Sequence, residues 1–265
     1  MRLPGVPAVG PLPPLAETWR RSLAEFVGTF ALLFVGVGTI MAIGAAPDAG
    51  TLEVALAHGL VIAVMVSAVG HISGGHFNPA ITFGFMLTRR MSVLLGLAYW
   101  LAQFTGGVLA VLLLRWIFPA ANRDAAQLGA PARHTIEVGQ ALVVEAVLTF
   151  FLVWVVFATT ADPRGTYTAI AGLAIGLVVV FDNLVGYPLT GAMLNPARAF
   201  GPQLIQNAWS GWGEFWLWYV GPFAGGAIAA LLYDELYLRP LGPVAVGPPE
   251  TGVAEPGPGI SARTP

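Results

Sequence analysis

Six long apolar stretches, separated by short polar segments, dominate the pattern of the chain. Each has close to the roughly 20 residues that a helix needs to cross about 30 Å of hydrocarbon. They cover residues 22–43, 53–70, 92–118, 141–160, 169–186 and 215–238. The pattern therefore predicts an all-α membrane protein with six transmembrane helices.

Two shorter apolar segments remain, at residues 78–87 and 195–205. With a rise of about 1.5 Å per residue, each would cross about half of a bilayer. Two half-helices that meet at the midplane together complete one crossing, which is a known device of membrane transport proteins. We therefore expect two re-entrant half-helices beside the six spans.

The two halves of the chain, about 20–118 and 137–239, repeat one pattern. A Glu-x-x-x-Thr-Phe sequence at Glu25 returns 120 positions later at Glu145, and an Asn-Pro-Ala triplet at Asn78 returns 117 positions later at Asn195. Because each half holds three spans, the second half must insert upside down relative to the first. Inverted repeats place their shared site at the bilayer centre.

Composition agrees with a membrane protein and excludes several functions. Of the 265 residues, 56% are hydrophobic and 10% are charged, and the mean hydropathy is +0.75, whereas soluble domains average roughly 25% charged residues. The absence of cysteine excludes disulfides, thiolate metal sites and cysteine nucleophiles. The net charge of −2 argues against a nucleic-acid partner. His71 and His76 lack metal-ligand spacing on a helix, so we expect no metal and no other cofactor.

The arginines predict the orientation in the membrane. With six spans, both termini share one side with the loops that follow spans two and four. Eight arginines lie on that side: Arg2, Arg20, Arg21, Arg89, Arg90, Arg164, Arg239 and Arg263. The positive-inside rule makes this side cytoplasmic. We expect the protein to lie in the cell membrane. We expect disordered proline-rich ends at 1–19 and 240–265 around a channel domain at 20–239, and the N-terminus shows no cleavable signal pattern.

An Asn-Pro-Ala triplet opens each predicted half-helix, at Asn78-Pro79-Ala80 and at Asn195-Pro196-Ala197. Asparagine is a strong N-cap, and proline suits the first helical position. Each half-helix would therefore start in mid-membrane with its positive dipole end facing the other. The asparagine amides would donate to a passing water and interrupt the chain along which a proton hops, while the dipoles repel cations. Two unrelated helix caps are the alternative.

The residues just before each triplet must be non-helical backbone at membrane depth. Such backbone is tolerated only where it is buried in protein or lines a wet cavity. Its carbonyls are predicted to line a pore and to replace part of the hydration shell of a water. These carbonyls belong to Gly74, Gly75, His76, Phe77, Gly191, Met193 and Leu194.

Three ionisable residues are predicted at membrane depth, where charges are costly and functional by default. Glu25 and Glu145 are each expected to accept hydrogen bonds from the amides of a re-entrant loop, and a proton relay is the alternative. Arg198 directly follows the second triplet in a helix too short to carry its charge easily to the headgroups. It is therefore expected to face the pore, where it bonds solutes and opposes cations. Snorkelling toward the surface is the alternative.

These features together resemble the major intrinsic protein, or aquaporin, superfamily, from about residue 20 to residue 239. The resemblance is carried by Glu25, Glu145, residues 76–80, residues 195–198 and the Gly-Pro-Phe-Ala-Gly-Gly run at 221–226. It implies a right-handed bundle of six tilted helices with two half-helices. It also implies a homotetramer with one pore per subunit, which passes water and other small uncharged solutes and excludes protons and ions.

The resemblance further implies an outer constriction, which is expected at His58, Asn183, Ala192 and Arg198. Strict water channels of this family have Phe and His at the first two positions. Glycerol facilitators have Trp and Gly there, with an Asp after the arginine, where this chain has Ala199. A His at the first position is similar to plant tonoplast intrinsic proteins, and residues 70–77 and 200–202 resemble nodulin-like intrinsic proteins.

We hypothesise that this opening is at least as wide as a strict water filter. It would admit water and also ammonia, urea, peroxide or neutral metalloid hydroxides. His58 and Asn183 supply extra polar contacts, and Ala192 leaves room. A His58 that packs against a neighbouring helix is the alternative, and Asp182 is expected to be paired near the outer mouth.

A secondary active transporter is the main competing function, because inverted repeats and broken helices occur there too. It would need acidic coupling-ion sites at the midplane, whereas both deep glutamates have a structural role in our interpretation. An intramembrane hydrolase is disfavoured, since the sequence has no Gly-x-Ser-x-Gly elbow and no His-Glu-x-x-His. We therefore expect a channel, not an enzyme, whose partners are small uncharged solutes, membrane lipid and further copies of the chain.

Overall fold

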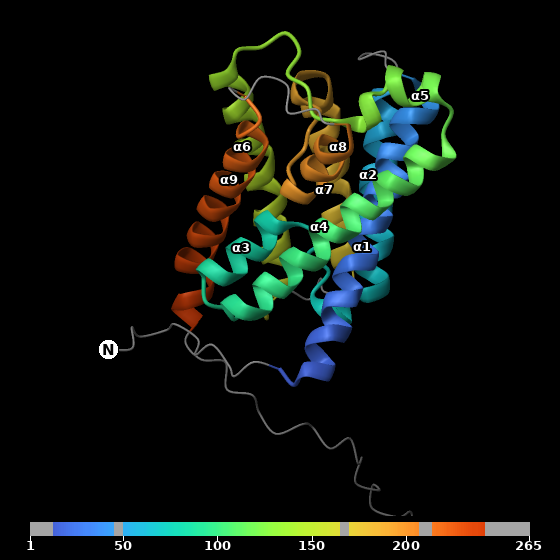
Figure 1. The fold of residues 1–265 in the computed structure, drawn as a ribbon. Coiled ribbons are helices and arrows are strands. Elements are labelled where there is room, and N and C mark those ends of the chain that lie inside the picture. The colour runs from blue at the N-terminus through green and yellow to red at the C-terminus, as the bar shows by residue number, and fades with distance from the viewer. Residues whose placement is uncertain (1–12, 45–49, 165–169, 207–213, 242–265) are drawn as a thin grey trace, which may run out of the picture.

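A computed structural model describes residues 13–44, 50–164, 170–206 and 214–241 of the chain. Six long helices run side by side (Figure 1). They are α1 (Leu15–Ile43), α2 (Thr51–Ser73), α4 (Val93–Ile117), α6 (Val138–Val156), α7 (Ala171–Thr190) and α9 (Leu217–Tyr233). The half-helices are α3 (Pro79–Leu87) and α8 (Pro196–Gln206). The short elements are α5 (Ala120–Ala125), η1 (Gln127–Gly129), η2 (Phe157–Ala161), η4 (Asp234–Leu238) and η5 (Arg239–Leu241).

The predicted fold class is confirmed, with small shifts of the helix ends. Five of the long helices are long and apolar enough to cross a membrane. The sixth, α9, has 17 residues and continues directly into the π-helical turn η4. Helix α1 begins at Leu15, so residues 15–19 are helical and not part of a disordered end. Most of the two predicted tails, including Arg2 and Arg263, lies outside the described residues.

The two halves of the chain interlock through the half-helices. Helix α3, from the first half, packs against α9 of the second, and α8, from the second half, packs against α4 of the first. The most extensive contacts between long helices join α2 to α7, α6 to α9 and α1 to α4. In this arrangement the two half-helices are packed among the long helices, at the place where the two halves of the chain meet.

Glycines at equivalent places of the repeat allow two of these helix pairs to approach closely. A Cβ atom on Gly106 of α4 would lie 2.6 Å from the carbonyl oxygen of Phe26 in α1. A Cβ atom on Gly225 of α9 would lie 1.9 Å from the carbonyl oxygen of Ala146 in α6. Small residues that bring backbones together are the usual basis of helix packing in membranes. Both contacts position helices that carry the glutamates described below.

Candidate functional site

The two half-helices begin at asparagine caps of the kind that the sequence predicts. The Oδ1 atom of Asn78 accepts from the amide of Ala80 at 2.8 Å, and Pro79 is the first helical residue. In the second half, Oδ1 of Asn195 accepts from the amides of Ala197 and Arg198 at 3.0 and 3.3 Å. Each cap satisfies backbone donors that would otherwise be unpaired at membrane depth.

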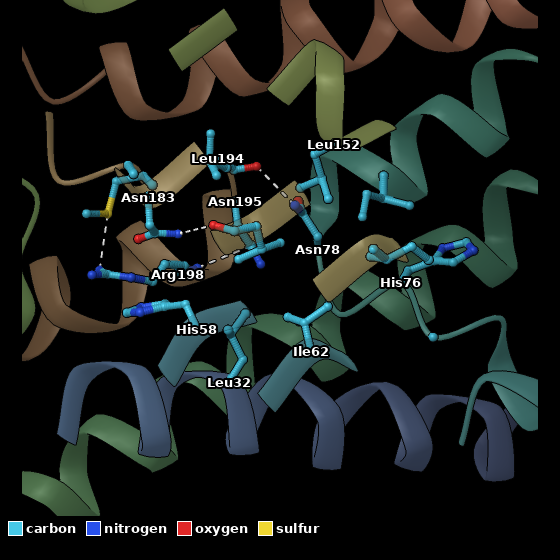
Figure 2. Close-up of a pocket in the computed structure, with 16 residues that line it drawn as sticks. Leu32, His58, Ile62, His76, Asn78, Leu152, Asn183, Leu194, Asn195 and Arg198 are labelled. Carbon is cyan, nitrogen blue, oxygen red and sulfur yellow. Dashed lines mark hydrogen bonds between the residues drawn. The ribbon is translucent and has the colours of Figure 1, made fainter. Parts of the chain in front are cut away.

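The two caps meet each other across the molecule. The Nδ2 atom of Asn78 donates to the carbonyl of Leu194 at 3.0 Å, and Nδ2 of Asn195 donates to the carbonyl of Phe77 at 2.8 Å. These reciprocal bonds join residues more than 100 positions apart in the sequence. Figure 2 shows Asn78 and Asn195 beside one another within the same cavity. The amino ends of α3 and α8 therefore abut.

A cavity, called the lumen below, lies beside the two asparagines and is lined by residues from both halves. Apolar side chains form much of its wall: Leu32, Ile62, Ile81, Leu152, Ile175 and Val179. Sequence reasoning did not name these residues. Ile175, Val179 and Asn183 are spaced four positions apart and therefore lie on one face of α7. Since Asn183 was predicted to line the pore, this spacing could have identified Ile175 and Val179 as lining residues. The wall is thus apolar with a few polar groups, which suits a binding or passage site.

The segments before the caps adopt unusual backbone conformations. Phe77, Ala192 and Leu194 have φ angles of 49°, 45° and 56°, in the left-handed region that side chains seldom occupy. Gly75, His76, Met193 and Leu194 line the lumen, and Gly191 lines the outer vestibule. The carbonyl oxygens of Phe77 and Leu194 each accept one hydrogen bond from an asparagine amide, and each keeps a second lone pair. The amide of Gly74 ends α2 by donating to Gly70.

Each deep glutamate holds one of these segments. Both carboxylates are fully buried. Glu25 accepts from the amides of His76 and Phe77 at 2.9 and 2.6 Å, as well as from Ser73 Oγ and Gln103 Nε2. Glu145 accepts from the amides of Met193 and Leu194 at 3.0 and 2.8 Å, and from Thr190 Oγ1.

These hydrogen bonds separate two interpretations of the glutamates. A carboxylate that accepts from backbone amides through both oxygens stabilises the loop that carries those amides. Neither carboxylate is among the residues that line the lumen described here, so this geometry favours loop support over a relay or a coupling-ion site.

All four residues of the expected constriction line the same lumen: His58, Asn183, Ala192 and Arg198. The structure therefore brings together positions from α2, α7, the second re-entrant loop and α8. Figure 2 shows His58, Asn183 and Arg198 toward one end of the cavity and His76 toward the other. The ring of His76 is held by Thr82 Oγ1, 3.0 Å from its Nδ1 atom, and stacks on Phe85.

The hydrogen bonds at the constriction determine which polar atoms stay free. Nδ2 of Asn183 donates to the carbonyl of Val179 at 2.9 Å, which leaves Oδ1 without a protein partner among the described residues. Nδ1 of His58 lies 2.8 Å from the carbonyl of Val54; since a carbonyl only accepts, Nδ1 carries the ring proton. The tip of the ring packs against Gly36 on α1.

Arg198 is buried beside the lumen and is clamped at its outer end. Its Nη1 atom donates to the carbonyl of Gly129 at 2.8 Å and contacts the sulfur of Met193 at 3.1 Å. Arg198 and Met193 line both the lumen and an outer vestibule that also includes Gln127, His134 and Tyr187. The guanidinium therefore stands where the vestibule narrows into the lumen. The contribution of the Met193 side chain was not predicted, because only its carbonyl was assigned to the pore.

An ion pair joins two loops at the outer side. Nη2 and Nε of Arg133 donate to the carboxylate of Glu214 at 2.8 and 3.1 Å. These hydrogen bonds from Arg133 lower the pKa of Glu214. The segment before α6 is thereby tied to the segment before α9.

The expectation for Asp182 was wrong. The side chain is fully buried in α7, and neither carboxylate oxygen has a hydrogen-bond partner among the described residues. It is therefore not paired at the outer mouth. The neighbouring Asn183 lines the lumen. Adjacent residues of an α-helix point about 100° apart around its axis. Asp182 therefore points away from the lumen and into the packing between helices.

The sequence model of the family described as "Major intrinsic protein" matches residues 15–233. Aquaporin TIP4-4 of Zea mays is 42% identical over 229 residues, which cover 83% of this chain and 87% of that protein. Aquaporin TIP1-2 of Musa acuminata is 41% identical over 229 residues, covering 84% and 88%. Among solved structures, an aquaglyceroporin from Plasmodium falciparum has the same fold, with a TM-score of 0.75, 22% identity, and coverage of 85% of this chain and 100% of that one.

Proposed function

The chain belongs to the major intrinsic protein family, and on that premise we propose that its lumen conducts water and a wider set of small uncharged solutes while excluding protons and ions. As a member of this family, the chain is a multi-pass membrane protein that acts as a passive channel, and it is not an enzyme. The observation that carries the finer proposal is the pair of reciprocal bonds from Asn78 and Asn195 to the carbonyls of Leu194 and Phe77 in the opposite re-entrant loops.

The caps supply the means of excluding protons. Each asparagine amide has two N–H groups. One of them is bonded to the opposite loop, and the other is available to a water in the lumen. A water that accepts from both asparagines is oriented with its own hydrogens pointing away, so the hydrogen-bonded chain is interrupted there. The abutting amino ends of α3 and α8 add positive potential that opposes cations.

The constriction supports passage of solutes larger than water. Ala192 contributes only a methyl group, and the tip of His58 packs against α1. Oδ1 of Asn183 offers an acceptor, while Nε of Arg198 offers a donor without a protein partner among the described residues. A solute with both donors and acceptors, such as urea, can exchange hydration for these contacts. Ammonia, peroxide and neutral metalloid hydroxides meet the same requirement.

Solute-resolved flux tests this proposal. The full chain is reconstituted into liposomes, and stopped-flow light scattering follows volume changes with water alone, urea, ammonia and boric acid. We expect faster flux than in empty liposomes for water and for at least one larger solute, proportional to the gradient and without saturation. Transport of water alone would overturn the wider selectivity, and saturable uptake coupled to an ion gradient would overturn the passive mechanism.

Four further assignments are proposals that rest on the resemblance and on the arginine pattern. The channel domain spans about 20–239, the protein lies in the cell membrane, both termini are cytoplasmic, and four copies assemble with one pore each. The position of the lumen within a single chain supports a pore per subunit. Arg20, Arg21, Arg89, Arg90, Arg164 and Arg239 support the orientation.

A further inference from the structure

An apolar groove lies on the surface of the helix bundle between α3 and the first turns of α4, away from the lumen. Phe83, Met86 and Leu87 contribute one wall, and Val93, Leu97 and Trp100 contribute the other. Leu97 and Val93 are 48% and 63% exposed, so the groove is open along its length. Figure 1 shows α3 and α4 next to one another, joined by the short turn that contains Arg89.

The aromatic part of the groove is fixed and apolar. The indole nitrogen of Trp100 donates inward to the carbonyl of Pro79 at 3.1 Å, so its polar atom is satisfied within the protein. The rings of Phe83, Trp100 and Phe223 contact one another, with centroids 5.4 to 6.5 Å apart. Such a surface suits a hydrocarbon chain and has little to offer a polar ligand.

Arg89 stands at one end of this groove as an unpaired cation. Its side chain is exposed, and its guanidinium has no hydrogen bond or ion pair within the described part of the chain. The backbone holds it in place: φ is 60°, and its amide donates to the carbonyl of Met86 at 3.0 Å. The adjacent Arg90 is different, because it is bound to the buried Asp234. The turn therefore presents one free positive charge beside an apolar trough.

The carboxylates on the same side of the protein as Arg89 do not neutralise its charge. The described acids there are all engaged within the chain: Glu17 with Arg21, Asp162 with Arg164, Asp234 with Arg90 and Arg239, and Glu235 with Arg239. A second copy of the described part would therefore bring no unpaired carboxylate to Arg89. A phospholipid brings both a phosphate and hydrocarbon chains.

We propose that this groove is a binding site for an anionic phospholipid, whose headgroup pairs with Arg89 and whose acyl chain lies along α3 and α4. The site is independent of the permeation pathway. Because Asn78 caps the first turn of α3, a lipid bound in this groove packs against the side of a pore helix that faces away from the lumen. Binding is therefore expected to raise the thermal stability of the protein.

Native mass spectrometry of the purified full chain tests the proposal. The protein is equilibrated in detergent with equal amounts of phosphatidylglycerol and phosphatidylcholine, and retained lipids are counted. The wild type should retain phosphatidylglycerol preferentially. Arg89→Gln should lower that retention roughly fivefold, as expected for the loss of about 1 kcal/mol from one basic contact. Leu97→Trp should lower it by filling the groove with the charge intact.

Arg20→Gln is the matched control, since Arg20 is an exposed arginine of the same side that does not line this groove. Its substitution should leave lipid retention unchanged. Equal losses in Arg20→Gln and Arg89→Gln would overturn the site. Inorganic phosphate that raises the unfolding temperature as much as phosphatidylglycerol would show that the groove is not used. A change of subunit number in Leu97→Trp, with lipid retention unaltered, would assign the groove to a subunit interface instead.

Discussion

At the scale of single residues, Asn183 supplies the acceptor that the constriction offers to a solute. Its Oδ1 atom is a buried acceptor beside the lumen, without a protein partner among the described residues. An apolar side chain of similar size would leave the N–H groups of a passing urea unpaired on that wall. A water can turn its hydrogens toward other waters and is less affected.

We therefore predict that Asn183→Leu lowers urea permeability roughly fivefold relative to water, as expected for the loss of about 1 kcal/mol of hydrogen bonding. Stopped-flow measurement of both solutes on one preparation gives the ratio. Ile175→Leu, two turns away on the same lining face of α7, is the control and should leave the ratio unchanged. An unaltered ratio in Asn183→Leu would remove Asn183 from selectivity.

Gly36 determines where the ring of His58 lies. A Cβ atom at Gly36 would stand 2.3 Å from Nε2 of His58, whereas Nδ1 is held by Val54. Gly36→Ala must therefore displace the ring, and we predict reduced urea flux with a smaller effect on water. In Gly38→Ala the new methyl would meet only Leu114 at 3.2 Å, and permeability should stay close to the wild type. Equal behaviour of the two variants would support a His58 that merely packs between helices.

The residue scale also shows how far sequence reasoning reaches. Asn78, Asn195, Glu25 and Glu145 could be identified because polar groups at membrane depth are costly and need a purpose. The bonds between each asparagine and the opposite loop could not, because they depend on how two segments more than 100 residues apart meet. Asp182 was misjudged since a sequence shows that a residue lies in a span but not which neighbours surround it.

At the scale of elements, the glutamates connect spans to re-entrant loops. In Glu145→Gln, the amide nitrogen of glutamine would face the backbone donors of Met193 or Leu194, where the carboxylate now accepts. We predict a loss of roughly 1–3 kcal/mol of stability, as for an unsatisfied buried donor, together with reduced water flux. Thermal unfolding and stopped-flow on the same sample measure both. Glu53→Gln, at an exposed position of α2, should change neither. Wild-type stability combined with an altered proton leak in Glu145→Gln would instead support a proton relay.

The ion pair between Arg133 and Glu214 predicts a pH-dependent contribution to stability. The pKa of Glu214 is lowered in the folded protein by hydrogen bonds from Arg133. Its contribution is therefore complete above the unfolded pKa, about 4.3, and is lost as the pH falls through the lower folded value. The difference in unfolding temperature between wild type and Glu214→Gln should be constant from pH 7 to about pH 5 and shrink below about pH 4. A difference that grew on acidification would contradict the assignment.

Most elements were predictable, and the exceptions have physical reasons. Apolar length reveals a span, so the six long helices and both half-helices lie close to their expected positions. Helix α1 begins seven residues earlier than expected. Its polar first turns, in which Glu17 pairs with Arg21, are helical without being apolar, so an estimate from apolar length leaves them out. Helix α7 continues to Thr190 through Pro188, which an estimate from apolar length alone cuts short.

At the scale of the whole molecule, the fold places one pore within one chain and leaves apolar surfaces outside it. We predict that the solubilised protein is a tetramer in which each subunit conducts independently. Native mass spectrometry gives the subunit number. Mixed tetramers with increasing numbers of blocked subunits should lose water flux in direct proportion to the blocked fraction. A steeper loss would indicate a pathway shared between subunits.

The central claim is that water crosses through the lumen in which the two half-helices meet. The most direct test compares osmotic water flux in liposomes that contain equal amounts of wild type and Ala192→Trp, since an indole at this lining position would obstruct the lumen while Arg198 and both caps stay in place. The wild type should conduct water much faster than empty liposomes, without proton leak, and the folded variant should match empty liposomes. Full water flux in the folded variant would show that water takes another route.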